Sequence, residues 1–126
     1  MSRKLQIITT LFFAALLVSA LASSAIAATG PVKIDSRVTL AQSDPFHGKV
    51  LSKKAACERN RTVEVYKVIA GPDGLFDVTK SDAQGEWSIA AGTPNGDFYA
   101  VAKQRSIDTN STTLVCKKAV SPTVTF

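Results

Sequence analysis

Histidine and cysteine are scarce in this chain of 126 residues, which holds one histidine and two cysteines. A Ser-His-Asp triad or a histidine-based metal site would have to use His47. The alternation around His47 places it on the outward face of a strand beside Lys49, where a surface side chain is expected. A zinc site needs more ligands than these residues supply. The composition therefore predicts no enzyme and no cofactor or metal site.

The chain also lacks dense acidic loops and basic segments interleaved with aromatic residues. Four aspartates lie in or beside predicted turns: Asp73, Asp77, Asp82 and Asp97. They lack the D-x-D-x-D spacing of a calcium loop, so we expect them to cap the local backbone. The basic doublets Lys53-Lys54 and Lys117-Lys118 have no aromatic neighbours of the kind a nucleic-acid face uses. We expect solvated charge on loops and no nucleic-acid partner.

The one long apolar run lies at the N-terminus, from Leu5 to Leu21, after a short basic opening. Small residues follow it in the A-x-A pattern of Ala25 and Ala27, with Ala28 next. The pattern predicts a signal-peptide helix over residues 1–27, cleaved before Ala28, and a secreted or periplasmic protein without a stable membrane span. An uncleaved anchor is the alternative, because a run of about 17 residues is at the lower limit for spanning a bilayer.

The two cysteines, Cys57 and Cys116, both follow the predicted cleavage point. In an oxidising compartment an even pair in a small domain predicts one disulfide. Closing a loop of about 60 residues would stabilise the fold by roughly 4 kcal/mol in the chain-entropy model.

Seven short segments of the remaining chain have the alternation of strands, and none has the periodicity of an amphipathic helix. They cover residues 34–40, 46–52, 62–69, 75–80, 86–89, 97–104 and 119–126. Turn residues separate nearly every pair, and the stretch 105–114 is polar, so we expect it to be a loop. The pattern predicts an all-β fold, a seven-stranded antiparallel Greek-key β-sandwich, in one domain over residues 34–126 after a leader over 28–33. A small closed barrel is the competing architecture.

The predicted core takes one face of these strands: Phe46, Val50, Val63, Val65, Val78, Trp87, Ile89 and Val124. Trp87 alternates with polar neighbours in a predicted hairpin over residues 77–89, although a carbohydrate-stacking role is the alternative. Val63 and Val65 share one face, whereas Tyr66 and Val68 share the other, so this strand is either covered on both sides or bulged. Gly48 indicates a bulge or a close backbone approach.

Four motifs follow one another along the chain: an F-x-G-x-V opening from Phe46, a C-x-x-x-R-x-V strand from Cys57, a D-x-x-G-x-W turn from Asp82 and a G-x-x-Y-A strand from Gly96. In this order they resemble the motifs of the carboxypeptidase-regulatory-like, or prealbumin-like, domains of secreted bacterial proteins. Asn95 between Pro94 and Gly96 departs from the family pattern. The resemblance implies a transthyretin-like sandwich with a structural or binding role and no peptidase activity. The urate-pathway hydrolase of that fold needs several histidines and a C-terminal tetrapeptide that this chain lacks.

Three functional hypotheses follow. The first is a non-enzymatic module, a monomer, that binds another protein or a component of the cell envelope. The second is a small-ligand or carbohydrate-binding module that uses a sheet face. The third is an inhibitor of an extracellular hydrolase that presents the segment 105–115. Sequons at Asn60 and Asn110 matter only in a eukaryotic secretory pathway.

Overall fold

The computed structural model describes residues 30–43, 46–90 and 92–126. The predicted signal peptide and its cleavage residues Ala25, Ala27 and Ala28 lie outside them. The described residues form strands with one short helix, which confirms the all-β class. In chain order the elements are β1 (Val32–Ile34), β2 (Ser36–Val38), β3 (Phe46–Ser52), α1 (Ala55–Glu58), β4 (Thr62–Lys67), β5 (Gly74–Lys80), β6 (Glu86–Ile89), β7 (Asp97–Ala102), β8 (Arg105–Asp108), β9 (Thr113–Cys116), β10 (Ala119–Val120) and β11 (Val124–Thr125).

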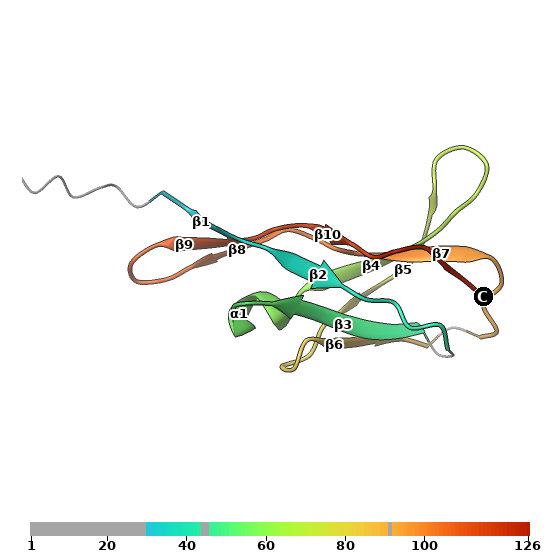
Figure 1. The fold of residues 1–126 in the computed structure, drawn as a ribbon, viewed down its shortest axis with the longest axis horizontal. Helices are drawn as coiled ribbons and strands as arrows, with labels where there is room; N and C mark the ends of the chain where they lie inside the picture. The colour runs from blue at the N-terminus through green and yellow to red at the C-terminus, as the bar shows by residue number, and fades with distance from the viewer. Residues whose placement is uncertain (1–29, 44–45, 91) are drawn as a thin grey trace, which may run out of the picture.

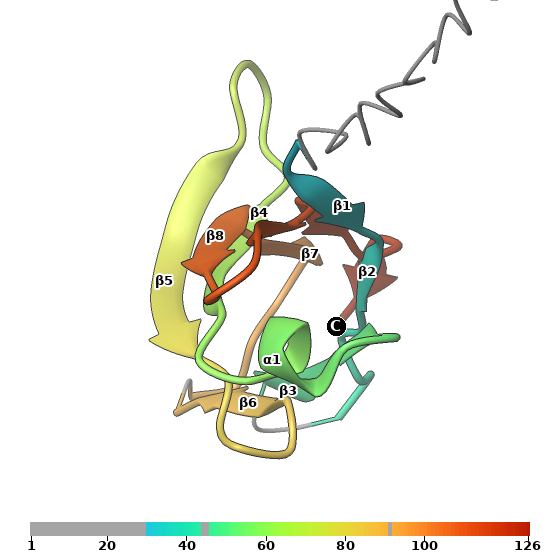
Figure 2. The ribbon, with the colours of Figure 1, turned by 90° about the vertical axis from the view of Figure 1, so that its left-hand side faces the viewer.

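Two antiparallel sheets enclose the core (Figure 1). One has the order β2-β3-β6, and the larger has the order β10-β7-β4-β5 with β11 also paired to β7. A third sheet, β1-β9-β8, extends the molecule at one end, and there β1 runs parallel to β9. The end with β1, β8 and α1 faces the viewer in Figure 2. The C-terminus and the loop between β4 and β5 lie at the opposite end (Figure 1).

The core is an apolar cluster drawn from both of the larger sheets. Of the eight predicted core residues, six are buried: Phe46, Val50, Val63, Val65, Trp87 and Ile89. Val124 is half-buried and packs against the cluster. The Phe46 ring makes edge contacts with the rings of Phe76 and Phe126, at centroid distances of 5.3 and 4.7 Å. Aromatic rings from β3, β5 and the C-terminus therefore pack together at this part of the core.

The prediction that Val78 belongs to the core was wrong, because its side chain is 46% exposed. The register between β4 and β5 shifts at Val65 and Tyr66, so β5 carries one extra residue there. The extra residue is Phe76 of β5. β4 itself keeps its alternation, with Val63 and Val65 buried and Tyr66 half-buried on the opposite face, so the bulge considered for this strand lies in its partner instead. Because a bulge reverses the alternation beyond it, Phe76 contacts the core ring of Phe98 while Val78 points outward.

The predicted hairpin of residues 77–89 was also wrong, although both of its strands exist. β6 pairs with β3, and β5 pairs with β4, so the turn at residues 81–85 carries the chain from one sheet to the other. Asp82 organises this turn, since its Oδ1 accepts the backbone N–H groups of Gln84 and Glu86 at 2.9 Å each. Gly85 has φ of +80°, and a Cβ there would lie 2.5 Å from the Val50 carbonyl oxygen.

Other segment boundaries differ from the prediction as well. The stretch 105–114 is not a loop, because β8 and β9 form a hairpin whose turn covers only Thr109–Thr112.

The described residues contain eleven strands rather than the seven predicted, and β1 begins inside the expected leader. The expected first strand is split at Asp35 into β1 and β2, which join different sheets. Pro122 separates β10 from β11 at the edge of the larger sheet, as its missing N–H donor predicts.

The predicted disulfide between Cys57 and Cys116 is present and links α1 to β9. Beside it lies Arg61, whose side chain is fully buried and makes no ion pair with a carboxylate of the described residues. Its guanidinium instead donates to Ser36 Oγ and to the carbonyl oxygens of Cys57, Lys103 and Lys117, at 2.8 to 3.1 Å. Burial, and secondarily the charge of Arg105, lowers the pKa of Arg61 from its usual value. This group joins β2, α1 and the residues that directly follow β7 and β9 at one point.

Candidate functional site

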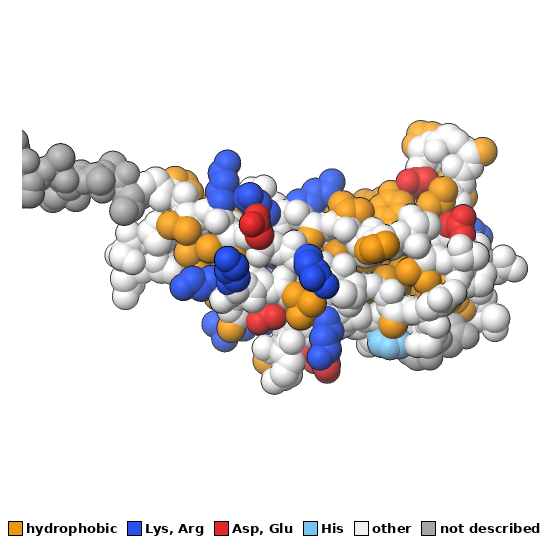
Figure 3. Space-filling view, in the orientation of Figure 1, with side chains coloured by type: hydrophobic (Ala, Val, Ile, Leu, Met, Phe, Trp, Pro, Cys, Tyr) orange, Lys and Arg blue, Asp and Glu red, His pale blue; other side chains and the backbone are white. Residues whose placement is uncertain are grey.

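The outer face of the larger sheet carries apolar and aromatic side chains and one glutamate. Register places them in two rows across the strands, Leu75-Tyr66-Tyr99 and Val78-Glu64-Val101-Val120. We call these seven residues the outer sheet face. Leu75, Val78 and Val120 are 55%, 46% and 57% exposed. In Figure 3 hydrophobic side chains gather around β7 and β10, toward the loop between β4 and β5.

Tyr66 and Tyr99 form the centre of this face. Their rings stack with an interplanar angle of 15° and a centroid distance of 5.5 Å. The Tyr66 hydroxyl donates to Glu64 Oε2 and the Tyr99 hydroxyl donates to Asp73 Oδ2, each at 2.8 Å. These hydrogen bonds stabilise the protonated phenols, so they raise the pKa of both tyrosines. Two hydroxyls anchored at their tips hold a pair of large rings in one orientation.

The raised pKa values predict an alkaline titration that can be measured directly, because the chain has only these two tyrosines. In the folded protein, tyrosinate absorbance near 295 nm should develop at higher pH than for free tyrosine. A pKa raised on folding adds stability below the free value of about 10, and that contribution disappears as pH rises through the folded value. Asp73→Asn removes the carboxylate that holds the Tyr99 hydroxyl, so it should lower the pKa of Tyr99 toward its free value. A titration identical to that of the urea-unfolded chain would contradict the hydroxyl geometry.

A shallow hollow of about 790 Å³ adjoins the tyrosines. Its lining combines Tyr66, Tyr99, Val101 and Val120 with the polar side chains of Glu64, Lys103, Gln104 and Lys118. Lys103 Nζ lies 3.4 Å from Glu64 Oε1, and the Glu64 side chain is only 14% exposed. The hollow thus offers an aromatic centre with charged and hydrogen-bonding groups on one side, a combination found in many binding sites.

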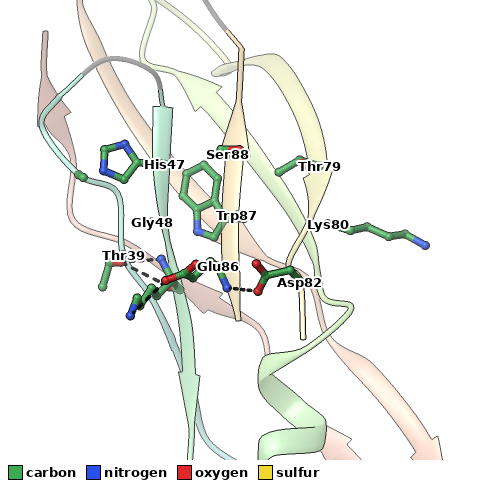
Figure 4. A pocket seen from close by; sticks show the side chains of 11 residues that line it. Thr39, His47, Gly48, Thr79, Lys80, Asp82, Glu86, Trp87 and Ser88 are labelled. Carbon is green, nitrogen blue, oxygen red and sulfur yellow. Dashed lines mark hydrogen bonds and ion pairs between the residues drawn. The ribbon is translucent and has the colours of Figure 1, made fainter. Parts of the chain in front are cut away.

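A second hollow, of about 660 Å³, lies over β3 and β6 and is lined mostly by polar residues (Figure 4). Both carboxylates that line this hollow, those of Glu86 and Asp82, already make contacts within the protein. Glu86 pairs with Lys49 at 3.5 Å, and Asp82 binds the turn backbone. His47 lies half-buried on the outward side of β3. These engaged carboxylates favour a structural role for this surface.

Trp87 borders the second hollow from the core side. It is only 3% exposed, and it packs across from Gly48, where a Cβ would lie 1.8 Å from the Thr39 carbonyl oxygen. Gly48 therefore marks a close backbone approach, one of the two predicted alternatives. The Trp87 indole N–H lacks a hydrogen-bond partner within the described residues. Because the ring is enclosed, Trp87 offers no stacking surface for a sugar.

The remaining predicted residues do not assemble a reactive centre. Over residues 30–43, 46–90 and 92–126, no three side chains of His, Cys, Asp or Glu are grouped to hold a metal ion. Asp73 and Asp97 each accept a side-chain hydroxyl, from Tyr99 and from Thr125, and Asp77 caps its own strand at the Val78 N–H. The same part of the chain has no helix with the length and apolar character needed to cross a bilayer.

One sequence-based hypothesis placed a ligand on a sheet face, but sequence reasoning did not identify the residues of the outer sheet face. The available signal was that Tyr66 and Val68 lie opposite Val63 and Val65 on one strand, which indicates apolar side chains on both faces. The other residues of this face, such as Leu75, Tyr99 and Val120, come from other strands, so only the strand register could place them beside Tyr66.

Comparison of the chain with protein-family models, curated proteins and solved structures gives no match.

Proposed function

We propose that the chain is a non-enzymatic module that acts outside the cytoplasm and binds another protein or a component of the cell envelope through the outer sheet face. The secretory signal, the transthyretin-like Greek-key sandwich and the monomeric state expected from the sequence are parts of this proposal. The observation that carries it is the exposure of the apolar side chains of Leu75, Val78 and Val120 around two anchored tyrosines. Exposed apolar patches with a polar border are characteristic of interaction sites.

The chemistry of this face suits binding better than catalysis. Tyrosine contributes a large contact area at low entropic cost and is enriched among residues that dominate interface energies. The hydroxyls of Tyr66 and Tyr99 are held by carboxylates, so ligand binding would require little additional ordering of the rings. β5 is also the terminal strand of its sheet, and its free edge could pair with an extended segment of a partner.

Carbohydrate binding is the second candidate, and the hollow beside Tyr99 is what favours it. Aromatic rings accompanied by Lys103, Gln104 and Lys118 could contact both the apolar face and the hydroxyls of a sugar. The inhibitor hypothesis loses its basis, because the segment 105–115 is mainly a paired hairpin rather than a long tethered loop.

Site-specific cross-linking in the producing cell tests the proposal. A photoreactive residue at Leu75 or Val120 should give one discrete adduct, while the same residue at exposed Ser88, on β6 of the other sheet, should give none. Excess wild-type protein should compete for the adduct, and the Tyr99→Ala protein should compete at least about tenfold less well, as expected for loss of an interface anchor. Binding of the protein to a sugar on a glycan array would instead support carbohydrate binding, the second candidate.

Two results would contradict this function. One is equal cross-linking from Ser88 and from the outer sheet face. The other is turnover of a substrate by the exported protein that a single polar substitution abolishes.

A further inference from the structure

The disulfide brings the two basic doublets of the chain to the same end of the molecule. Lys53 and Lys54 directly precede α1, which contains Cys57, and Lys117 and Lys118 directly follow Cys116. The two cysteine Cα atoms are 5.4 Å apart. Doublets separated by more than 60 positions in the sequence therefore flank one covalent link.

Asp35 connects these lysines in space. Its Oδ1 lies 2.9 Å from Lys117 Nζ. The pKa of Asp35 is lowered chiefly by its hydrogen bond and charge interaction with Lys117, and Lys53 lowers it further. A hollow of about 300 Å³ next to Asp35 is lined by Arg37, Leu51 and Lys53 as well. We call the group of Arg37, Lys53, Lys54 and Lys117 around Asp35 the basic end.

Charge is distributed unevenly along the molecule. The stretches 30–38, 52–59 and 105–118, which form this end, contain eight basic and three acidic residues. The rest of the described residues contains five basic and six acidic residues. In Figure 3 most of the Lys and Arg side chains lie over the half of the molecule with β1, β2 and α1. Such a field attracts anionic surfaces over a range of about a Debye length.

Apolar side chains accompany the charges at this end. Leu51 is 37% exposed and pairs in register with Arg37, so both lie on one face of their strands. Val32, at the start of β1, is 42% exposed. A soluble polyanion gains little from such side chains, whereas the boundary between lipid headgroups and acyl chains accepts them. Aromatic residues that would stack on nucleic-acid bases are not among the side chains that line this hollow.

We propose that the basic end docks reversibly on an anionic phospholipid surface, with Lys53, Lys54, Lys117 and Arg37 facing the headgroups and Leu51 at the interface. This deepens the proposed envelope role but uses a surface separate from the outer sheet face. Docking there would leave β7, β10 and the tyrosines free for a second partner.

Vesicle co-sedimentation of the exported protein tests the proposal. Binding should be strong on vesicles of phosphatidylglycerol mixed with phosphatidylcholine, weak on phosphatidylcholine alone, and reduced by salt. Each basic residue near an anionic surface strengthens binding by roughly fivefold. Lys53→Gln with Lys54→Gln should therefore weaken partitioning about 25-fold. The matched pair Lys67→Gln with Lys80→Gln removes the same charge from β4 and β5 and should change it far less.

Further variants separate the competing explanations. Leu51→Ser should weaken vesicle binding but leave binding to soluble polyphosphate unchanged. Tyr66→Ala should keep vesicle binding intact even if cross-linking through the outer sheet face fails. Equal binding to neutral and anionic vesicles, equal losses from the two lysine pairs, or no effect of Leu51→Ser on vesicles would each overturn the lipid proposal.

Discussion

Arg61→Met is expected to lower the free energy of unfolding by about 3 kcal/mol or more. The substitution leaves Ser36 Oγ and three backbone carbonyl groups without the donors that now satisfy them. Each buried acceptor that loses its partner costs about 1–3 kcal/mol. For a domain of this size the melting temperature should fall by at least about 12 °C, which calorimetry or thermal circular dichroism would detect.

Two variants control for charge and for hydrogen bonding by arginine in general. Arg61→Lys keeps the charge but replaces a planar group of five donors with a compact ammonium, so an intermediate loss is expected. Arg105→Met removes a partly exposed arginine that donates to the carbonyl oxygens of Arg59 and Asn60, and it should cost less than about 1 kcal/mol. If Arg61→Met and Arg105→Met are equally stable, the buried network does not carry the stability assigned to it.

Removing the disulfide is the second large effect that we expect. The cysteines are 59 positions apart, and a closed loop of that length restricts the unfolded chain by about 4 kcal/mol. Cys57→Ala with Cys116→Ala should lower the urea midpoint accordingly. The m value should rise, because an unfolded chain without the cross-link exposes more surface. An unchanged midpoint would show that packing alone holds α1 against β9.

The disulfide and Arg61 should act together. Arg61 donates to the carbonyl oxygen of Cys57 itself and to that of Lys117, which directly follows Cys116. Without the cross-link these two acceptors can separate. A double-mutant cycle between Arg61→Met and the cysteine pair should give a coupling energy of at least about 0.5 kcal/mol, as expected for groups in contact. If the two losses of stability are strictly additive, Arg61 and the disulfide stabilise the fold independently.

The all-β class, most of the core and the disulfide could be predicted because they depend on local signals. Alternation by two residues placed Trp87 and Ile89 inward, and it did the same for Phe46 and Val50. Two cysteines in a small domain leave one simple pairing. In each case neighbouring residues, or composition alone, carried the information.

Val78 and the β5–β6 connection could not be predicted, because both depend on strand pairing. The bulge opposite Val65 reverses the face of Val78, and no residue type in β5 indicates it. Residues 81–85 are rich in turn formers, which suit a tight hairpin and a crossing between sheets equally well. In the observed pairing of β6 with β3, Gly48 lies opposite Trp87, and its lack of a side chain leaves room for the indole and for the Thr39 backbone.

Both candidate surfaces are also products of the tertiary structure. The outer sheet face joins Leu75, Tyr66, Tyr99 and Val120 from four strands, and the basic end joins lysines that flank the two cysteines. The sequence by itself determined which residues alternate, where turns form and which cysteines can pair, since these follow from the backbone and from near neighbours. Only the tertiary structure decided the sheet partners, the burial of Arg61 and the two surfaces, because register and cross-links bring distant residues into contact.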